Sequence, residues 1–259
     1  MLTIDTLCYT SNLRYVNACE KFAFAAATIV LCVVSRSIAV ACVVLLVTGW
    51  LTIRKGGISF FRYEKLMRIP IFFLLLSTIT IIVNISRTPM NAFAFNAGNY
   101  YLTGDWDSIL FGVQLILTAL ASVSCLYFLS LNTPMTDILD ILTKLHCPKI
   151  VIELMLLIYR FIFVLLSIAS AISTSQDSRL GNVTLRTSYR SFGTMISALF
   201  IRAFKKSNAL YDAMESRCYD GTIHVLNESH PAKKREILAI ILFEIVLLLI
   251  WILELYIKS

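Results

Sequence analysis

Six long apolar stretches dominate the pattern of hydrophobic and polar positions along the chain. A helix needs roughly 20 apolar residues to cross a bilayer core of about 30 Å. The runs that reach or approach this length lie at 22–34, 37–53, 69–86, 108–131, 150–172 and 237–257. This pattern predicts an all-α polytopic membrane protein.

The first two runs are short, and the sequence Ser35-Arg36-Ser37 separates them. This arrangement predicts a tight hairpin of two helices that cross all or part of the membrane. The alternative is a single long helix, which would have to bury the charged side chain of Arg36.

The charges in the connections predict which side of the membrane each one faces. The connection 54–68 carries five basic residues and one acidic residue, so we expect it to be cytoplasmic. The connection 87–107 contains Asp105, Asp107 and the aromatic residues Tyr100, Tyr101 and Trp106, a combination typical of the outer interface. Residues 132–149 then return to the inside.

The run 150–172 is apolar, but we predict that it does not cross the membrane. A crossing would place residues 176–235 outside, and this stretch holds ten basic residues against five acidic ones. The run also contains Glu153 and Arg160 on one helix face. We therefore expect five spans, with the N-terminus inside and the C-terminus outside. The expected domains are a membrane domain at 1–131, a cytoplasmic helical module at 132–235 and a last transmembrane helix at 236–259.

The composition agrees with a membrane protein. Hydrophobic residues make up 58% of the 259 residues and charged residues 15%, with a mean hydropathy of +0.78. A soluble domain carries roughly a quarter charged residues, so the composition excludes a soluble enzyme and a disordered chain. Asp5, Arg14 and Glu20 interrupt the first 20 residues, and we expect no cleaved signal peptide. The seven cysteines form no C-x-x-C pair and are expected to be mostly buried thiols.

Residues that carry catalytic or metal chemistry are sparse. The three histidines are His146, His224 and His230, and none has a partner at the spacing of a metal site. The chain also has no phosphate-binding G-x-x-x-x-G-K-[ST] loop. We therefore expect no metal site, no cofactor and no enzymatic activity, ATPase activity included. The polar residues in the expected spans, which could pair structurally or line an ion pathway, are Asn84, Gln114, Glu244 and Glu254.

Two other functional classes fit the sequence less well. A self-contained secondary transporter would show inverted repeats and spans interrupted by Gly or Pro, whereas the nine glycines and five prolines lie mainly in loops. A membrane enzyme would need His, Asp or Glu clustered at one membrane depth, and these clusters are missing.

The expected cytoplasmic module contains two long helices and a short one. From Phe192 to Cys218 the apolar residues recur every three or four positions, which predicts one face of a long helix that stops at Asp220-Gly221. An earlier helix is expected from about 150 to 179, stopping at Gly181. A shorter amphipathic helix is expected to start near Thr136 and to end before Pro148.

Both long helices are expected to end in a small residue and an arginine, followed by glycine. The two segments are Ser178-Arg179-Leu180-Gly181 and Ser216-Arg217-Cys218-Tyr219-Asp220-Gly221, and Glu215 precedes the second. One interpretation is that each arginine complements the helix dipole, which is worth about 0.3–1 kcal/mol. The other is that each guanidinium enters an acidic groove on a partner and pairs bidentately. The residues alone leave both interpretations open.

These segments carry a resemblance to a known family. The chain resembles the transmembrane T component of energy-coupling factor (ECF) transporters, and specifically the CbiQ type of cobalt and nickel uptake systems. The resemblance covers essentially the whole chain. It lies in the N-terminal segments 4–11 and 16–21, in the two arginine motifs and above all in the block 213–221.

The resemblance implies a scaffold without catalytic activity. Two ATP-binding-cassette ATPase subunits would bind at Arg179 and Arg217, and a metal-binding S subunit would be held in the bilayer; no nucleic acid is expected. ATP binding would draw the ATPases together and move the S subunit through the two helices. The family often has Ala before and Gly after each arginine, and this chain departs from that pattern at Ser178, Leu180, Ser216 and Cys218. The residues expected to support the coupling site are Glu215, Asp220, Gly181 and Gly221. The alternative within the same architecture is a T component that serves a vitamin-type system.

Overall fold

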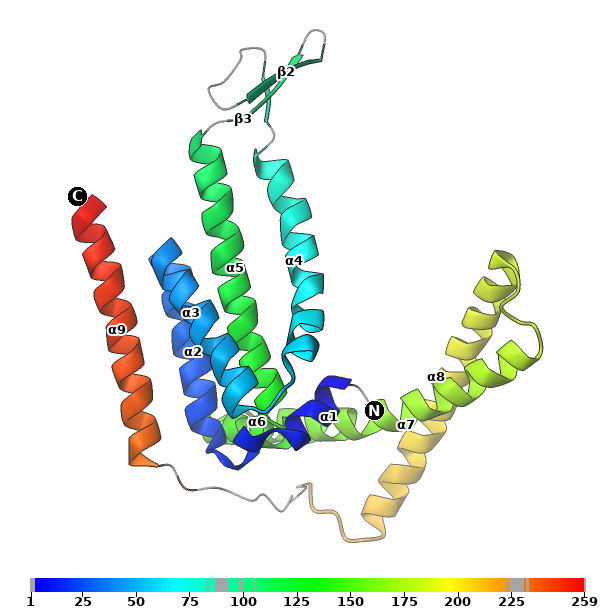
Figure 1. The fold of residues 1–259 in the computed structure, drawn as a ribbon. Helices are drawn as coiled ribbons and strands as arrows, with labels where there is room; N and C mark the ends of the chain where they lie inside the picture. The colour runs from blue at the N-terminus through cyan, green and yellow to red at the C-terminus, as the bar shows by residue number, and fades with distance from the viewer. Residues whose placement is uncertain are drawn as a thin grey trace. The chain divides into compact units, whose positions relative to one another are not determined.

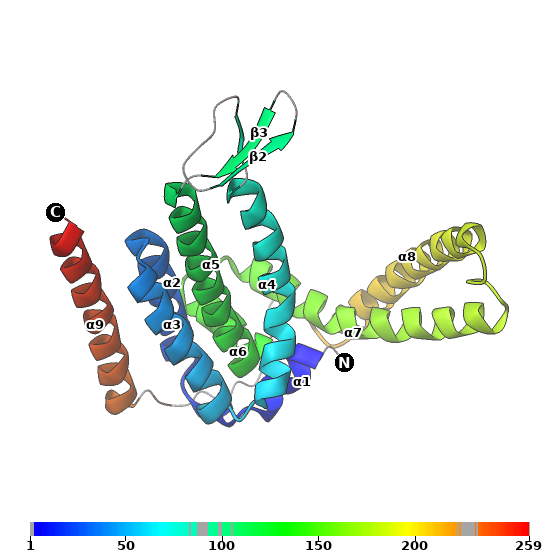
Figure 2. The same cartoon turned by 45° about the horizontal axis from the view of Figure 1, so that its top comes forward.

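The structure is a computed structural model that describes residues 3–82, 84–86, 93–97, 100–104, 106–221, 223, 231 and 233–258. The chain divides into two compact units. Leu2–Pro134 and Ser229–Ser259 together form one, here called the membrane unit, and Met135–Glu228 form the other, here called the hairpin unit. Each unit is described by itself, and Figures 1 and 2 show both of them.

The membrane unit is built mainly from long helices. Its elements are α1 (Thr3–Thr10), a 3-10 helix (Asn12–Tyr15), α2 (Ala18–Ser35), α3 (Ile38–Trp50), a π-helical turn (Leu51–Lys55), α4 (Phe60–Ile82), β1 (Asn84–Ser86), β2 (Phe93–Ala97), β3 (Tyr100–Gly104), α5 (Trp106–Asn132) and α9 (Lys234–Lys258). The predicted all-α polytopic class is confirmed, and the one departure is the small antiparallel sheet, in the order β1-β3-β2, between α4 and α5.

The predicted hairpin of the first two apolar runs is confirmed, and the single long helix is excluded. Helix α2 ends at Ser35, and the exposed Arg36 takes a left-handed conformation with a φ of 44°. The side chain of Ser37 then accepts a hydrogen bond from the backbone N–H of Val40 and caps α3.

The basic connection between α3 and α4 is shorter than the sequence predicted. Helix α4 begins at Phe60, so the predicted span 69–86 is wrong at both ends, and Asn84 starts β1 instead of lying in a helix. The charged residues of this segment form the first turns of the helix because they can stay exposed and pair with each other along its surface. Arg68 pairs with Glu64 one turn earlier at 2.9 Å.

Helix α5 forms the centre of the membrane unit, with α2, α3 and α4 around it (Figure 2). One buried cluster joins Cys32, Val40, Val44, Ala121 and Leu247 from α2, α3, α5 and α9. Buried hydroxyl groups add hydrogen bonds across these helices. The Ser124 hydroxyl on α5 lies 2.6 Å from that of Thr48 on α3 and 2.7 Å from that of Tyr63 on α4.

A buried lysine fastens the N-terminal segment to the end of α5. Lys21 is 3% exposed, and its ammonium donates to the carbonyl oxygens of Leu13 at 3.1 Å and Asn132 at 2.9 Å. Ser11 donates a further bond to the side-chain oxygen of Asn132 at 2.6 Å. The positive charge is therefore stabilised by backbone carbonyl dipoles.

Helix α9 contacts α2 and α3 through carboxylates that the sequence analysis had singled out. Glu244 accepts a hydrogen bond from the hydroxyl of Thr28 at 2.7 Å, and Glu254 accepts one from Ser37. The partner of Glu244 is thus a hydroxyl on α2. Because these contacts follow in the same order along both segments, α2 and α9 run in parallel. Gln114 on α5 donates its bond to the carbonyl of Arg36.

Among the residues that the structure describes, six helices are long and apolar enough to cross a membrane, by length and composition. They are Ala18–Ser35, Ile38–Lys55, Phe60–Ile82, Trp106–Asn132, Lys149–Ser178 and Lys234–Tyr256. The fifth of these lies in the hairpin unit, and the prediction that it does not cross stays a prediction.

The hairpin unit contains α6 (Met135–Lys144), α7 (Lys149–Ser178) and α8 (Leu185–Glu215). The short amphipathic helix and the first long helix are where the sequence predicted them, and α8 begins two turns before the predicted Phe192. Helices α7 and α8 are antiparallel. The Gln176 side chain donates to the Ser191 carbonyl near their connection at 2.8 Å, and Tyr219 donates to Glu153 at the other end at 2.8 Å.

Candidate functional site

Helix α7 ends in a Schellman motif with Arg179 as its C-cap residue. Leu180 follows with a φ of 59°, in the left-handed region. The N–H of Leu180 donates to the Asp177 carbonyl at 3.0 Å, and the N–H of Gly181 donates to the Gln176 carbonyl at 2.8 Å. These two bonds define the motif and satisfy the last carbonyls of the helix.

Helix α8 ends in the same motif, with Arg217 in the equivalent position. Cys218 has a φ of 58°, and its N–H donates to the Glu215 carbonyl at 3.0 Å. The N–H of Tyr219 donates to the Met214 carbonyl at 3.1 Å. The two sequence motifs therefore fold into matching backbone structures, and each arginine sits one residue before a left-handed turn.

The glycines do not have the role that the sequence predicted for them. Helix α7 ends at Ser178, within one residue of the predicted end, but its left-handed residue is Leu180 and not Gly181; α8 ends at Glu215, several residues before the predicted stop at Asp220-Gly221. The left-handed position belongs to Leu180 and Cys218, which occupy the places where the resembled family often has glycine. The sequence analysis missed this because it assigned the left-handed conformation to the nearest glycine.

Gly181 has a different function in the connection between α7 and α8. A Cβ atom on Gly181 would lie 2.8 Å from the Ser191 hydroxyl and 3.0 Å from the Gln176 carbonyl oxygen. Ser191 donates to the Gly181 carbonyl at 2.9 Å. The absent side chain therefore allows the end of α7 to approach α8 closely. A capping box of Thr184 and Thr187 then starts α8.

The end of α8 is held against the start of α7 by Glu153. One carboxylate oxygen accepts from the Tyr219 hydroxyl at 2.8 Å, and the other accepts from the Ile223 backbone N–H at 3.2 Å. The hydrogen bond to this carboxylate raises the pKa of the Tyr219 hydroxyl above its ordinary value of 10.0, because the carboxylate stabilises the protonated phenol. The sequence analysis noted Glu153 but missed this role, for which the only signal is an isolated acid in an apolar run.

Arg179 and Arg217 therefore lie at opposite ends of one antiparallel hairpin. Helix α8 has 31 residues and is about 46 Å long at a rise of 1.5 Å per residue. Both arginine side chains are exposed, and neither forms an ion pair with any residue that the structure describes. The flanking Ser178 and Ser216 donate their hydroxyls back to helix carbonyls, at 2.9 and 3.0 Å.

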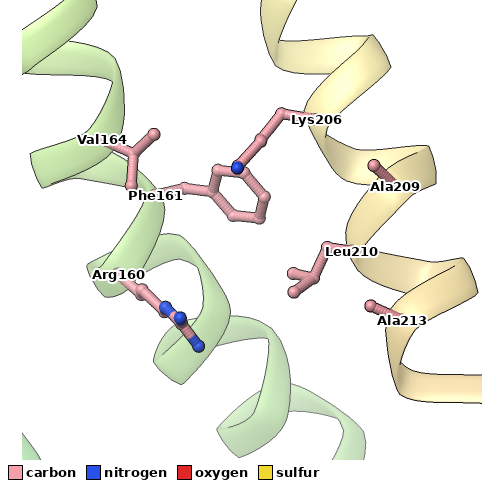
Figure 3. A pocket seen from close by; sticks show the side chains of 7 residues that line it. All are labelled: Arg160, Phe161, Val164, Lys206, Ala209, Leu210 and Ala213. Atoms are coloured by element: carbon pink, nitrogen blue, oxygen red, sulfur yellow. The ribbon is translucent and has the colours of Figure 1, made fainter.

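Between these ends the two helices enclose a space of about 280 Å³. Figure 3 shows Phe161 on α7 and Leu210 on α8 pointing toward one another across it, with Ala209 and Ala213 on the α8 side. The helices thus face one another across a largely apolar space and are joined by hydrogen bonds at both ends.

The remaining expected support residues are at the surface near Arg217. Glu215 and Asp220 are exposed, and Gly221 has a φ of 91° beyond the end of α8. Within the described part of the chain, no three His, Cys, Asp or Glu side chains group in a way that could hold a metal ion. His224 and His230 lie outside the described residues.

A family model described as "CbiQ: Cobalt transport protein" matches residues 10–228. The chain belongs to the CbiQ family. The cobalt transport protein CbiQ of Salmonella typhimurium is 29% identical over 229 residues, which cover 87% of this chain and all of that protein. The family is one of transport proteins, and this member is a membrane protein of that family.

Two further relatives match nearly the whole chain. An uncharacterized protein of Methanocaldococcus jannaschii is 31% identical over 250 residues, which cover 95% of this chain and 91% of the relative. A putative fused cobalt transport protein CbiMQ of Methanocorpusculum labreanum is 31% identical over 242 residues, which cover 93% of this chain and 40% of that protein.

Proposed function

We propose that this chain is the transmembrane T component of an ECF-type importer for cobalt ions, with nickel as the alternative cargo. It would couple ATP binding and hydrolysis by two partner ATPases to movement of a metal-binding S subunit in the membrane, without catalysing a reaction itself. The cobalt assignment is supported by the names of the CbiQ relatives and is favoured over a vitamin cargo for that reason.

The observation that carries the proposal is the pair of matching helix ends, in each of which an arginine directly precedes a left-handed residue. If the arginines served only to complement the helix dipole, they would need neither the same pattern of terminal hydrogen bonds nor a left-handed residue directly after each of them. A guanidinium that projects from a rigid helix end and lacks an ion pair within the chain can form two parallel bonds to a carboxylate of another protein. Two such ends on one hairpin fit two copies of one type of partner.

The parallel direction of α2 and α9 supports the five-span topology. With α7 outside the bilayer, the spans α2, α3, α4, α5 and α9 alternate in direction, so the first and the last are parallel. If α7 crossed alone, α9 would have to run against α2. The proposal therefore places the N-terminus and the hairpin unit in the cytoplasm and the C-terminus outside, in agreement with the basic residues of α8.

The coupling role is tested by purification from native membranes in mild detergent. We compare the tagged wild-type chain with Arg179→Ala, Arg217→Ala, the double variant and Arg186→Ala, an exposed arginine near the start of α8 that caps no helix end. Wild type and Arg186→Ala should copurify with ATPase subunits, and the double variant should lose them while remaining inserted. A wild-type chain that brings down no ATPase, or a double variant that retains it, would refute the proposal.

The orientation is tested with the exposed thiol of Cys218. A variant with the other six cysteines replaced is treated with a membrane-impermeant maleimide in inside-out and right-side-out vesicles. Labelling only in inside-out vesicles is the expected result. Labelling only in right-side-out vesicles would mean that the hairpin unit lies outside and that the span count is wrong.

A further inference from the structure

A cavity of about 290 Å³ lies in the membrane unit between the first turns of α2 and α9. Its walls are largely apolar and include the rings of Phe24, Phe128 and Phe243. The Phe24 ring is 5.4 Å from that of Phe128 and 5.6 Å from that of Phe243. The volume corresponds to about ten water molecules, which is larger than a single bare ion requires.

The buried acidic side chain of Glu20 lines this largely apolar cavity. Glu20 is 7% exposed, and neither of its carboxylate oxygens accepts a hydrogen bond from a described residue. Glu20 lies beside Glu236 and the backbone of Lys233 at the start of α9; Glu236 repels its charge, Lys233 attracts it, and the Lys233 ammonium is itself 3.9 Å from Glu236, so two carboxylates face one cation there. Two carboxylates that share one lysine at a buried position are undercompensated, so the cavity favours a ligand that carries positive charge and N–H groups.

The two lysines that line the cavity differ in what they can offer a ligand. The ammonium of Lys21 is buried and donates to the carbonyls of Leu13 and Asn132. The exposed side chain of Lys55 forms no ion pair with the residues that the structure describes. The cavity thus combines buried negative charge with an exposed positive charge at its edge.

The cavity also lies at a defined membrane depth. Glu20 and Glu236 are each the third residue of their helix, and the two helices run in parallel. Both carboxylates are therefore at the same face of the membrane unit, at the ends of apolar segments. This is the level of lipid headgroups.

We propose that this cavity binds the headgroup of phosphatidylethanolamine. The primary ammonium of the lipid donates to Glu20 and Glu236, its phosphate lies near Lys55, and the carbons next to the headgroup contact the aromatic wall. Phosphatidylcholine lacks N–H donors, and phosphatidylglycerol lacks the positive charge. The inference concerns the membrane unit alone and does not depend on the proposed coupling role.

The test is native mass spectrometry of the full chain in detergent, titrated with the three lipids at matched acyl chains. Phosphatidylethanolamine should occupy one saturable site at least tenfold more tightly than either other lipid. Glu20→Gln should weaken this binding by about ten- to a hundredfold, the range expected for hydrogen bonds to a charged group. The matched control is Glu64→Gln, which removes an exposed carboxylate paired with Arg68 and should bind like wild type.

A second variant tests the proposal independently, in case Glu20→Gln loses binding because it misfolds. Ala239 lines the cavity from α9, and Ala239→Trp fills the space while keeping both carboxylates; it should also abolish selective binding. Equal binding of all three lipids, or unchanged binding by both variants, would overturn the proposal. A further titration with Co²⁺ tests whether the cavity binds a metal ion instead of a lipid. If Co²⁺ displaces the lipid and Glu20→Gln no longer binds Co²⁺, the cavity is a cation site and the lipid proposal is wrong.

Discussion

The left-handed residue after Arg179 provides a quantitative test of the helix-end geometry. Leu180 has a φ of 59°, and its side chain is exposed, at 71%. A left-handed conformation costs an L-residue about 1–2 kcal/mol. Glycine avoids this cost but loses about 0.5–1 kcal/mol more chain entropy on folding. Leu180→Gly should therefore stabilise the folded chain by about 0.5–1 kcal/mol, since the exposed side chain contributes little burial.

The assay is thermal unfolding of the detergent-solubilised chain, followed by the circular dichroism of its helices. Leu180→Ala is the control because it removes the same side chain and keeps the left-handed cost. The glycine variant should melt about 1–4 °C above the alanine variant. His146 at the end of α6 and Cys218 at the end of α8 have φ values of 61° and 58°, so the same pair of variants can be made there. If glycine is no more stable than alanine at all three positions, the assigned backbone geometry is wrong.

Two further predictions concern the contacts that hold α7 and α8 together. Gly181→Ala should destabilise the chain by about 1–3 kcal/mol in thermal unfolding, because its Cβ would meet Ser191 and the Gln176 carbonyl. The control is Gly193→Ala, whose Cβ meets nothing within 4 Å and which should therefore stabilise the chain. An equal loss of stability at both positions would contradict the close approach at Gly181. Glu153→Gln should lower the pKa of Tyr219, measured by NMR of labelled tyrosine with Tyr219→Phe for assignment, because the carboxylate raises it. Because the pKa of Tyr219 is raised in the folded chain, the stabilisation from this contact is present below pH 10.0 and is lost as the pH rises through that raised pKa. An unchanged titration of Tyr219 in Glu153→Gln would refute the contact.

Most of the helical framework could be predicted from hydropathy, because apolar runs and punctuating residues act locally. The hairpin at Arg36 and the extents of α6 and α7 follow from such signals. The start of α4 could not be predicted from apolarity, because its first turns are charged and are stabilised by pairs one turn apart. The strands between α4 and α5 had no alternating pattern strong enough to reveal them.

The candidate coupling site was only partly accessible from the sequence. The residue types and the repeated position of Arg179 and Arg217 were visible, but their backbone geometry depends on non-glycine residues in a left-handed conformation, which no composition rule favours. The bonds of Glu153 to Tyr219 and Ile223 join residues about seventy positions apart. Such contacts follow from the antiparallel packing of two helices, which single-sequence patterns do not specify.

The discontinuous membrane unit has a consequence for biosynthesis. Helix α9 contacts α2 and α3, yet about a hundred residues separate it in sequence from the end of α5. At a synthesis rate of about 5–20 residues per second, the first four membrane helices wait about 5–20 s for this partner. During that interval Thr28 and Ser37 lack their carboxylate acceptors, and the buried surface beside Leu247 is open. The nascent chain therefore passes through a stage in which an incomplete bundle must be protected by lipid or by the insertion machinery until its last helix arrives.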